Sequence, residues 1–129
     1  MSDSLAGNLA TVLHLDDDSG ILEDVAKFLK LNGYRVLSAL NVAVAKVHLQ
    51  RERVDFAVVD LFLEGDDGEE LSNEFVRGEL HPRAIPYLRM TSAPGLVPPD
   101  AVGCAVLPKA TFRKEPEQLL KLLSETLGS

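Results

Sequence analysis

The sequence predicts a doubly wound α/β domain, in which helices cover both faces of a parallel β-sheet. Short apolar runs alternate along the chain with stretches of helical periodicity, and the connections between them are short. Parallel neighbouring strands need crossover connections, which the intervening helices supply with right-handed geometry. The chain has 129 residues, of which 46% are hydrophobic and 26% charged. That length suits one globular core and is too short for two.

The first half of the chain predicts two strands and two helices. Residues 11–15 (TVLHL) form an apolar run that stops at three aspartates, as a buried strand ending in a loop does. A helix starts at Ser19 and ends before Gly33, which provides a left-handed C-terminal cap. Residues 34–39 (YRVLSA) predict the second strand. Asn41 can cap the helix that follows it.

The second half repeats this alternation. Strands are expected at residues 54–59, 85–90 and 105–107, and helices at 69–80 and from Pro116 onward. The run at 54–59 (VDFAVV) ends on an aspartate, Asp60, as the first strand does. In the helix over 69–80 the apolar positions are Leu71, Phe75 and Val76.

One crossover departs from the pattern. Residues 93–104 (APGLVPPDAVGC) contain three prolines and two glycines. Proline removes helix hydrogen bonds and glycine weakens those that remain. The helix expected at this place, the fourth of the alternation, should therefore be shortened or absent, with room for a single turn after Pro99.

Composition argues against several classes of function. The net charge of −7 opposes the phosphate backbone, and the 13 Lys and Arg residues form no basic stripe, so direct nucleic-acid binding is not expected. No apolar run approaches the roughly 18 residues of a membrane span, so we expect a soluble, cytoplasmic protein. The single cysteine, Cys104, is expected to be a buried structural thiol, and His14 a packed strand residue.

Chemically matched side chains follow the predicted strands. They are Asp16, Asp17 and Asp18 after the first strand, Asp60 at the third, Thr91 and Ser92 at the fourth, and Lys109 at the fifth. Doubly wound sheets bind ligands outside the carboxyl ends of their strands. Clustered carboxylates raise each other's pKa unless a cation such as Mg²⁺ neutralises them. With that ion, a carboxylate can attack phosphorus while a lysine and a hydroxyl bind the phosphoryl oxygens.

The motifs LHLDDD, VVDLFLEGDDG, RMTS and LPK, in this order, resemble the response-regulator receiver domains, which are CheY-like. The resemblance covers residues 11–127. It implies a flavodoxin-like fold with five parallel strands in the order 2-1-3-4-5, and a bacterial phosphoprotein of two-component signalling. The receiver domain would span residues 11–129, preceded by an N-terminal extension over 1–10.

The resemblance also implies the ligands of a metal ion. Asp60 corresponds to the phosphoacceptor and to a metal ligand. Asp17 corresponds to a direct ligand of Mg²⁺ (or Mn²⁺), and Asp16 to a carboxylate that acts mainly through metal-bound water. The backbone carbonyl of Phe62 would be a further ligand.

The remaining roles concern the phosphoryl group and its donor. Thr91 corresponds to the hydroxyl that moves toward the phosphoryl group, and Lys109 to the ammonium that pairs with it. The donor would be a phosphohistidine on a histidine kinase or a histidine phosphotransfer protein, and the output a downstream protein target. No contact with nucleic acid or membrane is implied, and a homodimer is left open. The chain would be no enzyme beyond its own phosphorylation and dephosphorylation.

Several residues depart from the family's pattern. Ala110 replaces a proline that usually follows the lysine through a cis bond; a non-proline cis bond costs about 2.5–4 kcal/mol, so a trans bond is favoured. Val106 occupies the place of a switching aromatic residue, which puts the usual readout in doubt. Glu64 and Asp66 make the loop after the acceptor acidic. Phe62 is bulky, and we expect it to shield the acyl phosphate from water.

Two other functions fit part of the sequence. The LDDDSG segment also suits a haloacid-dehalogenase-like phosphatase, with Asp16 as nucleophile and Asp18 as general acid. Such an enzyme would need a further acidic pair after Lys109, and none suitable follows. The third candidate is a pseudo-receiver that binds proteins without being phosphorylated, against which the complete set of acid, hydroxyl and lysine groups argues.

Overall fold

The computed structural model describes residues 10–63, 65, 67–93, 95 and 104–127. Its strands are β1 (Thr11–Leu15), β2 (Arg35–Ala39), β3 (Phe56–Asp60), β4 (Tyr87–Thr91) and β5 (Ala105–Pro108). They form one sheet in the order β2-β1-β3-β4-β5, with every neighbouring pair parallel. The predicted fold class and strand order are both confirmed.

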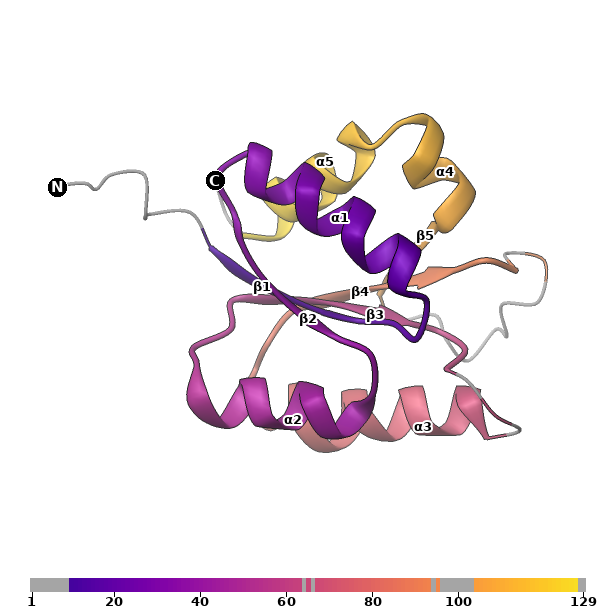
Figure 1. The fold of residues 1–129 in the computed structure, drawn as a ribbon. Coiled ribbons are helices and arrows are strands. Elements are labelled where there is room, and N and C mark those ends of the chain that lie inside the picture. The colour runs from indigo at the N-terminus through magenta and orange to yellow at the C-terminus, as the bar shows by residue number, and fades with distance from the viewer. Residues whose placement is uncertain (1–9, 64, 66, 94, 96–103, 128–129) are drawn as a thin grey trace, which may run out of the picture.

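Helices cover both faces of the sheet. They are α1 (Ser19–Leu31), α2 (Val42–Arg51), α3 (Gly68–Phe75) with its π-helical continuation η2 (Val76–Leu80), α4 (Lys109–Lys114) and α5 (Glu117–Thr126). In Figure 1, α1, α4 and α5 lie on one side of the sheet, and α2 and α3 on the other. Within the described residues, no helix is both long enough and apolar enough to cross a membrane.

Each face of the sheet has its own apolar core. Leu13 and Leu15 of β1 belong to the cluster that includes Phe75 of α3, whereas Val12 belongs to the cluster that includes Ile21 of α1. The change of side follows from the two-residue period of a strand. Strands buried on both faces explain why β3 is apolar throughout until Asp60.

The predicted helix ends are confirmed by their hydrogen bonds. The side chain of Asp18 accepts from the N–H groups of Gly20 and Ile21 at the start of α1. Asn41 caps α2 through the N–H of Val44 at 2.9 Å. Gly33 follows α1 with φ of 90°, a conformation that glycine adopts without strain.

The apolar face of α3 differs from the predicted one. Leu71 is 42% exposed, whereas Gly68, Ser72 and Phe75 are buried. These three residues stand four and three positions apart, so they share one side of the helix. Leu71 was wrongly placed in the core, because the hydrogen bonds of Ser72 bring a polar side chain inside instead.

Helix α4 was not predicted. It begins at Lys109, directly after β5, and spans only six residues, too few for a clear helical period. Phe112 is its buried anchor and meets Phe28 of α1 edge to face, with ring centroids 5.8 Å apart. The Lys109–Ala110 bond is trans, as expected. Cys104 is only half-buried, so its expected burial was wrong, because it directly precedes β5, a strand at the edge of the sheet.

Three expectations fall on residues outside the described part of the chain. They are the N-terminal extension expected over 1–10, of which residues 1–9 lie outside, the shortened helix after Pro99, and the acidic side chains of Glu64 and Asp66.

Candidate functional site

Three carboxylates converge at the carboxyl ends of β1 and β3. Leu15 pairs with Val59 across these strands, so the residues that follow, Asp16 and Asp60, lie side by side. Asp16, Asp17 and Asp60 each offer an oxygen within 4.8 Å of the others. Asp16 is 0% exposed and Asp60 2% exposed, whereas Asp17 is partly exposed. The predicted cluster is therefore formed, with one open side at Asp17.

Lys109 brings a buried cation to this cluster from the end of β5. Its Nζ lies 2.9 Å from Oδ2 and 3.1 Å from Oδ1 of Asp16, and 3.5 Å from Oδ2 of Asp60. Burial disfavours the ammonium, but the hydrogen bond and the charge of Asp16 outweigh it, so the pKa of Lys109 is raised. Lys109 is thus a permanent positive charge between two carboxylates.

The carboxylates are difficult to ionise without a further cation. Burial, and after it the charge of Asp16, raise the pKa of Asp60 to about 7, although the charge of Lys109 opposes the shift. Burial also raises the pKa of Asp16, against the hydrogen bond that it accepts from Lys109. The cluster therefore carries more negative charge than Lys109 alone can neutralise.

These residues fit a divalent ion of the magnesium type. Mg²⁺ prefers carboxylate and carbonyl oxygens and keeps several waters, which requires an open side. The cluster supplies three carboxylates, and its open side lies at the partly exposed Asp17. The elevated pKa of Asp60 is the expected signature of such a site without its cation.

Phe62 and Thr91 lie where the sequence predicts, next to the acceptor and at the end of β4. The N–H of Phe62 donates to Oδ1 of Asp60 at 3.3 Å, in a turn that holds the loop against the carboxylate. The buried hydroxyl of Thr91 accepts from the N–H of Ala93 at 2.9 Å. The Phe62 side chain is half-buried, as is Val106 on β5.

The loop after Asp60 is pressed against the start of α3. A Cβ placed on Gly68 would lie 1.8 Å from the carbonyl oxygen of Leu63. The N–H of Leu63 in turn donates to the carbonyl of Gly68 at 3.2 Å. Only glycine allows this approach, which accounts for the Asp67-Gly68 pair in the motif.

Asp18 does not join the carboxylate cluster. Its side chain is exposed and caps α1 through the N–H groups of Gly20 and Ile21. A general acid paired with Asp16 would have to face the same site. The capping role therefore argues against the phosphatase alternative.

His14 lies closer to the site than expected. Its burial as a packed strand residue is confirmed, and its Nε2 lies 3.8 Å from Oδ2 of Asp16. Burial and the nearby charge of Lys109 lower the pKa of His14 to about 3, so the ring is neutral at physiological pH. A histidine two positions before the first aspartate, and so on the same side of β1, was the available signal.

Ser72 and Arg89 are neighbours of the site to which the sequence analysis assigned no role. The Ser72 hydroxyl donates to the backbone carbonyl of Asp60 at 2.6 Å, and Nη2 of Arg89 donates to Ser72 Oγ at 2.5 Å. The only signal was an arginine inside the apolar run of β4, YLRMT.

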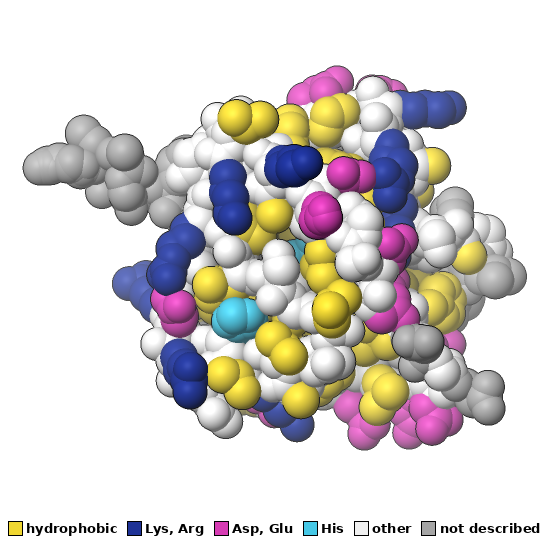
Figure 2. Space-filling model, in the orientation of Figure 1, with side chains coloured by type: hydrophobic (Ala, Val, Ile, Leu, Met, Phe, Trp, Pro, Cys, Tyr) yellow, Lys and Arg dark blue, Asp and Glu magenta, His cyan; other side chains and the backbone are white. Residues whose placement is uncertain are grey.

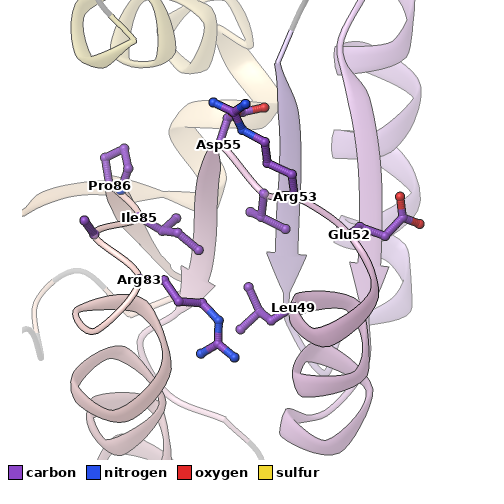
Figure 3. Close-up of a pocket in the computed structure, with 9 residues that line it drawn as sticks. Leu49, Glu52, Arg53, Asp55, Arg83, Ile85 and Pro86 are labelled. Atoms are coloured by element: carbon purple, nitrogen blue, oxygen red, sulfur yellow. The ribbon is translucent and has the colours of Figure 1, made fainter.

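A pocket lies at the opposite end of the sheet from the carboxylate cluster. The pocket has a volume of about 400 Å³. Figure 3 shows it beside Asp55 and Pro86, the residues that precede β3 and β4. Its charged side chains form ion pairs, Arg53 with Asp55 and Arg83 with Glu79. Its place at the amino ends of the strands differs from that of ligand sites in doubly wound sheets.

Comparison with known proteins gives one curated relative. Over 82 residues the chain is 33% identical to the phosphate regulon transcriptional regulatory protein PhoB of Pseudomonas aeruginosa. The alignment covers 64% of this chain and 35% of PhoB, so the chain spans about a third of that relative's length. No family model matches the chain.

Solved structures resemble the fold over nearly its whole length. A CheY-like response regulator receiver domain protein from Methanospirillum hungatei has a TM-score of 0.72 and 23% identity, covering 93% of this chain and 94% of the other. Chemotaxis protein CheY4 of Vibrio cholerae has a TM-score of 0.71 and 27% identity, covering 91% and 98%. The parallel sheet and its strand order agree with these comparisons. In sequence and in fold, the chain is similar to the response-regulator receiver domains of the CheY-like type.

Proposed function

We propose that this receiver domain accepts a phosphoryl group on Asp60 and signals through a partner protein. The observation that carries the proposal is the cluster of Asp16, Asp17 and Asp60, with the ammonium of Lys109 beside Asp16 and Asp60. Receiver domains are signalling domains that interact with kinases and downstream effectors. We assign the domain to residues 11–129, with an extension over 1–10, in a cytoplasmic protein.

In the transfer step the carboxylate oxygen of Asp60 attacks phosphorus. The P–N bond to the donor's imidazole breaks, the imidazole nitrogen takes up a proton, and an acyl phosphate forms on Asp60. Lys109, at 3.5 Å from Asp60, pairs with the phosphoryl oxygens, and the Thr91 hydroxyl donates to another of them. Later attack of water on phosphorus returns Asp60 and inorganic phosphate.

A magnesium ion, when bound, would neutralise charge on the carboxylates and on the transferred group. Asp17 and Asp60 would hold it directly, Asp16 mainly through bound water, and the backbone carbonyl of Phe62 would complete the set. The N–H of Phe62 already holds this turn to Asp60. The half-buried ring of Phe62 would limit the access of water to the acyl phosphate.

The phosphoryl donor would be a phosphohistidine on a histidine kinase or a histidine phosphotransfer protein. Apolar side chains beside the site support such a partner. Two pockets of about 410 and 420 Å³ share Leu40 and Asn41, and one of them reaches Asp17. Leu40 is 50% exposed, and Figure 2 shows apolar side chains between α1 and α2 on this side of the molecule.

The test is phosphorylation by a small donor. The protein is incubated with Mg²⁺ and acetyl phosphate, and a hydroxylamine-labile adduct is mapped by mass spectrometry. We expect modification at Asp60 that is lost in Asp60→Asn. Modification at Asp16 would favour the phosphatase. No modification, with acetyl phosphate or with a histidine kinase, would favour the pseudo-receiver.

A further inference from the structure

Arg89 is a charged residue in the interior of the sheet. It lies in the middle of β4, between Leu88 and Met90, and is 4% exposed. Among the described residues no carboxylate forms an ion pair with it, and the hydrogen bond of its guanidinium goes to Ser72 Oγ. A buried ion without a paired counter-ion costs several kcal/mol. A position that an apolar residue could fill therefore carries a costly cation.

The contact with Arg89 determines the direction of the Ser72 hydroxyl. A guanidinium has donors and no acceptor, so Arg89 must occupy a lone pair of Ser72 Oγ. The single hydroxyl hydrogen is then directed to the carbonyl oxygen of Asp60, at 2.6 Å. Donation by a cation also polarises the hydroxyl and strengthens the second bond. The two bonds form a chain from Arg89 through Ser72 to Asp60.

The two hydrogen bonds from Arg89 through Ser72 end on the peptide bond between Asp60 and Leu61. The same peptide donates from the N–H of Leu61 to the carbonyl of Met90 at 2.8 Å. The next N–H, of Phe62, binds the Asp60 carboxylate. Ser72 thus restrains the carbonyl side of a peptide whose N–H side is held by β4. The orientation of the Asp60 carboxylate depends on that peptide.

The charge of Arg89 acts on the same site. The residue lies two hydrogen bonds from the backbone of Asp60, within a low-dielectric interior where charges interact strongly. Three carboxylates meet here, and among the described residues Lys109 is the other cation that lies beside them. A second fixed positive charge opposes a divalent cation but favours the additional negative charge of a phosphoryl group.

We propose that Arg89 and Ser72 are positioning residues for phosphoryl transfer, which hold the Asp60 peptide in place and supply a buried positive charge for the phosphorylated state. This inference rests on the proposed function of Asp60. It predicts that loss of the charge has opposite effects on the two ligands of the site, Mg²⁺ and the phosphoryl group.

The decisive variant is Arg89→Met, which replaces the cation by an apolar side chain of similar length. Such replacements of buried ions are often neutral or stabilising, so the variant should fold. We expect Mg²⁺ to bind about threefold to tenfold more tightly, because a repelling charge is gone. At saturating Mg²⁺, the rate constant of phosphorylation by acetyl phosphate should fall about fivefold to tenfold. Structural damage would instead lower both the Mg²⁺ affinity and the phosphorylation rate constant.

Arg89→Lys separates charge from geometry. It keeps the positive charge and loses the planar fork that reaches Ser72. Its Mg²⁺ affinity should stay within about twofold of the parent's. Its rate constant of phosphorylation by acetyl phosphate should lie between those of the parent and Arg89→Met. Ser72→Ala leaves Arg89 without its acceptor, so the paired variant Ser72→Ala/Arg89→Met is the stable test of the tether. The double variant should be phosphorylated by acetyl phosphate more slowly than Arg89→Met alone.

The control is Ser124→Ala, which removes a hydroxyl bonded to the carbonyl of Lys121 on α5, on the other side of the sheet. This substitution should leave the Mg²⁺ affinity and the phosphorylation rate constant unchanged. If folded Arg89→Met binds Mg²⁺ no more tightly, or is phosphorylated within twofold of the parent's rate, the inference is wrong. If the parent itself is not phosphorylated, the proposed function fails, and the Mg²⁺ titrations still decide whether Arg89 acts on the cluster.

Discussion

The ammonium of Lys109 contacts both carboxylate oxygens of Asp16, at 2.9 and 3.1 Å, in a site that excludes solvent from Asp16. Its distance to Oδ2 of Asp60 is longer, 3.5 Å. In the metal-free protein Lys109 is therefore held mainly by Asp16. A phosphoryl group on Asp60 would compete with Asp16 for the same ammonium.

Removal of this ammonium should destabilise the metal-free protein. Lys109→Met leaves buried carboxylates without their cation, and breaking a buried pair in this way costs about 3–5 kcal/mol. We expect a loss of that order in the free energy of unfolding by urea at pH 8 with EDTA, partly recovered by Mg²⁺. Lys114→Met, at an exposed position of the same helix, should change it by less than about 0.5 kcal/mol. Equal effects of the two substitutions would contradict the buried pair.

Asp60 should make the metal-free protein less stable as the pH rises. Its folded pKa is about 7, above the ordinary aspartate pKa of 3.8, so between these values the folded state binds more protons than the unfolded state. Stability is therefore lost as the pH rises through this window. Asp60→Asn removes this ionisable group. At pH 8 its free energy of unfolding, measured with urea, should exceed the parent's by about 1–3 kcal/mol, with little difference near pH 4.

Asp24→Asn is the control for this pH dependence. Asp24 is exposed and pairs with Arg113 at the surface, where an ion pair is worth about 0–1 kcal/mol. Its unfolding profile against pH should follow that of the parent. A gain in stability of Asp60→Asn that is the same at pH 4 and pH 8 would show that ionisation of Asp60 is not its cause.

The fold was predictable because its main signals are local. β1 and β3 are apolar runs that end on aspartates, and α1 has a cap at each end, Asp18 and Gly33. Each of these signals lies within a few residues of the element that it defines. Helix α4 was missed for the same reason, since six residues with one buried apolar side chain, Phe112, leave no periodic signal.

The site was predictable only where its residues stand at strand ends. Asp16, Asp60 and Lys109 follow strands that the sequence defines, so the parallel sheet brings them together. Ser72 and Arg89 stand inside a helix and a strand, 17 positions apart. Their contact depends on the packing of α3 against the sheet, which no local pattern encodes.

Two neighbouring aspartates should have separable roles. Asp17 contributes to the carboxylate cluster, whereas Asp18 caps α1. Asp17→Ala should weaken Mg²⁺ binding more than tenfold, with the free energy of unfolding in EDTA changed by less than about 0.5 kcal/mol. Asp18→Ala should cost about 0.5–2 kcal/mol of stability and leave Mg²⁺ affinity within about twofold. The opposite pattern, with Mg²⁺ binding dependent on Asp18, would support the phosphatase arrangement.

Two glycines of the α3 and η2 region should respond in opposite directions to alanine. A Cβ on Gly68 would overlap the Leu63 carbonyl at 1.8 Å, so Gly68→Ala must displace the loop that carries Phe62. We expect a loss of about 2–4 kcal/mol in the free energy of unfolding and weaker Mg²⁺ binding.

Gly78 has nothing within 4 Å of its ideal Cβ position. Gly78→Ala should therefore stabilise the protein by about 0.5–1 kcal/mol, because alanine favours a helical backbone, with Mg²⁺ affinity unchanged. Urea denaturation and calorimetric Mg²⁺ titration of both variants test this contrast. Since the substitution is the same, a stable Gly68→Ala protein with normal Mg²⁺ affinity would show that the contact between the loop and α3 does not position the site.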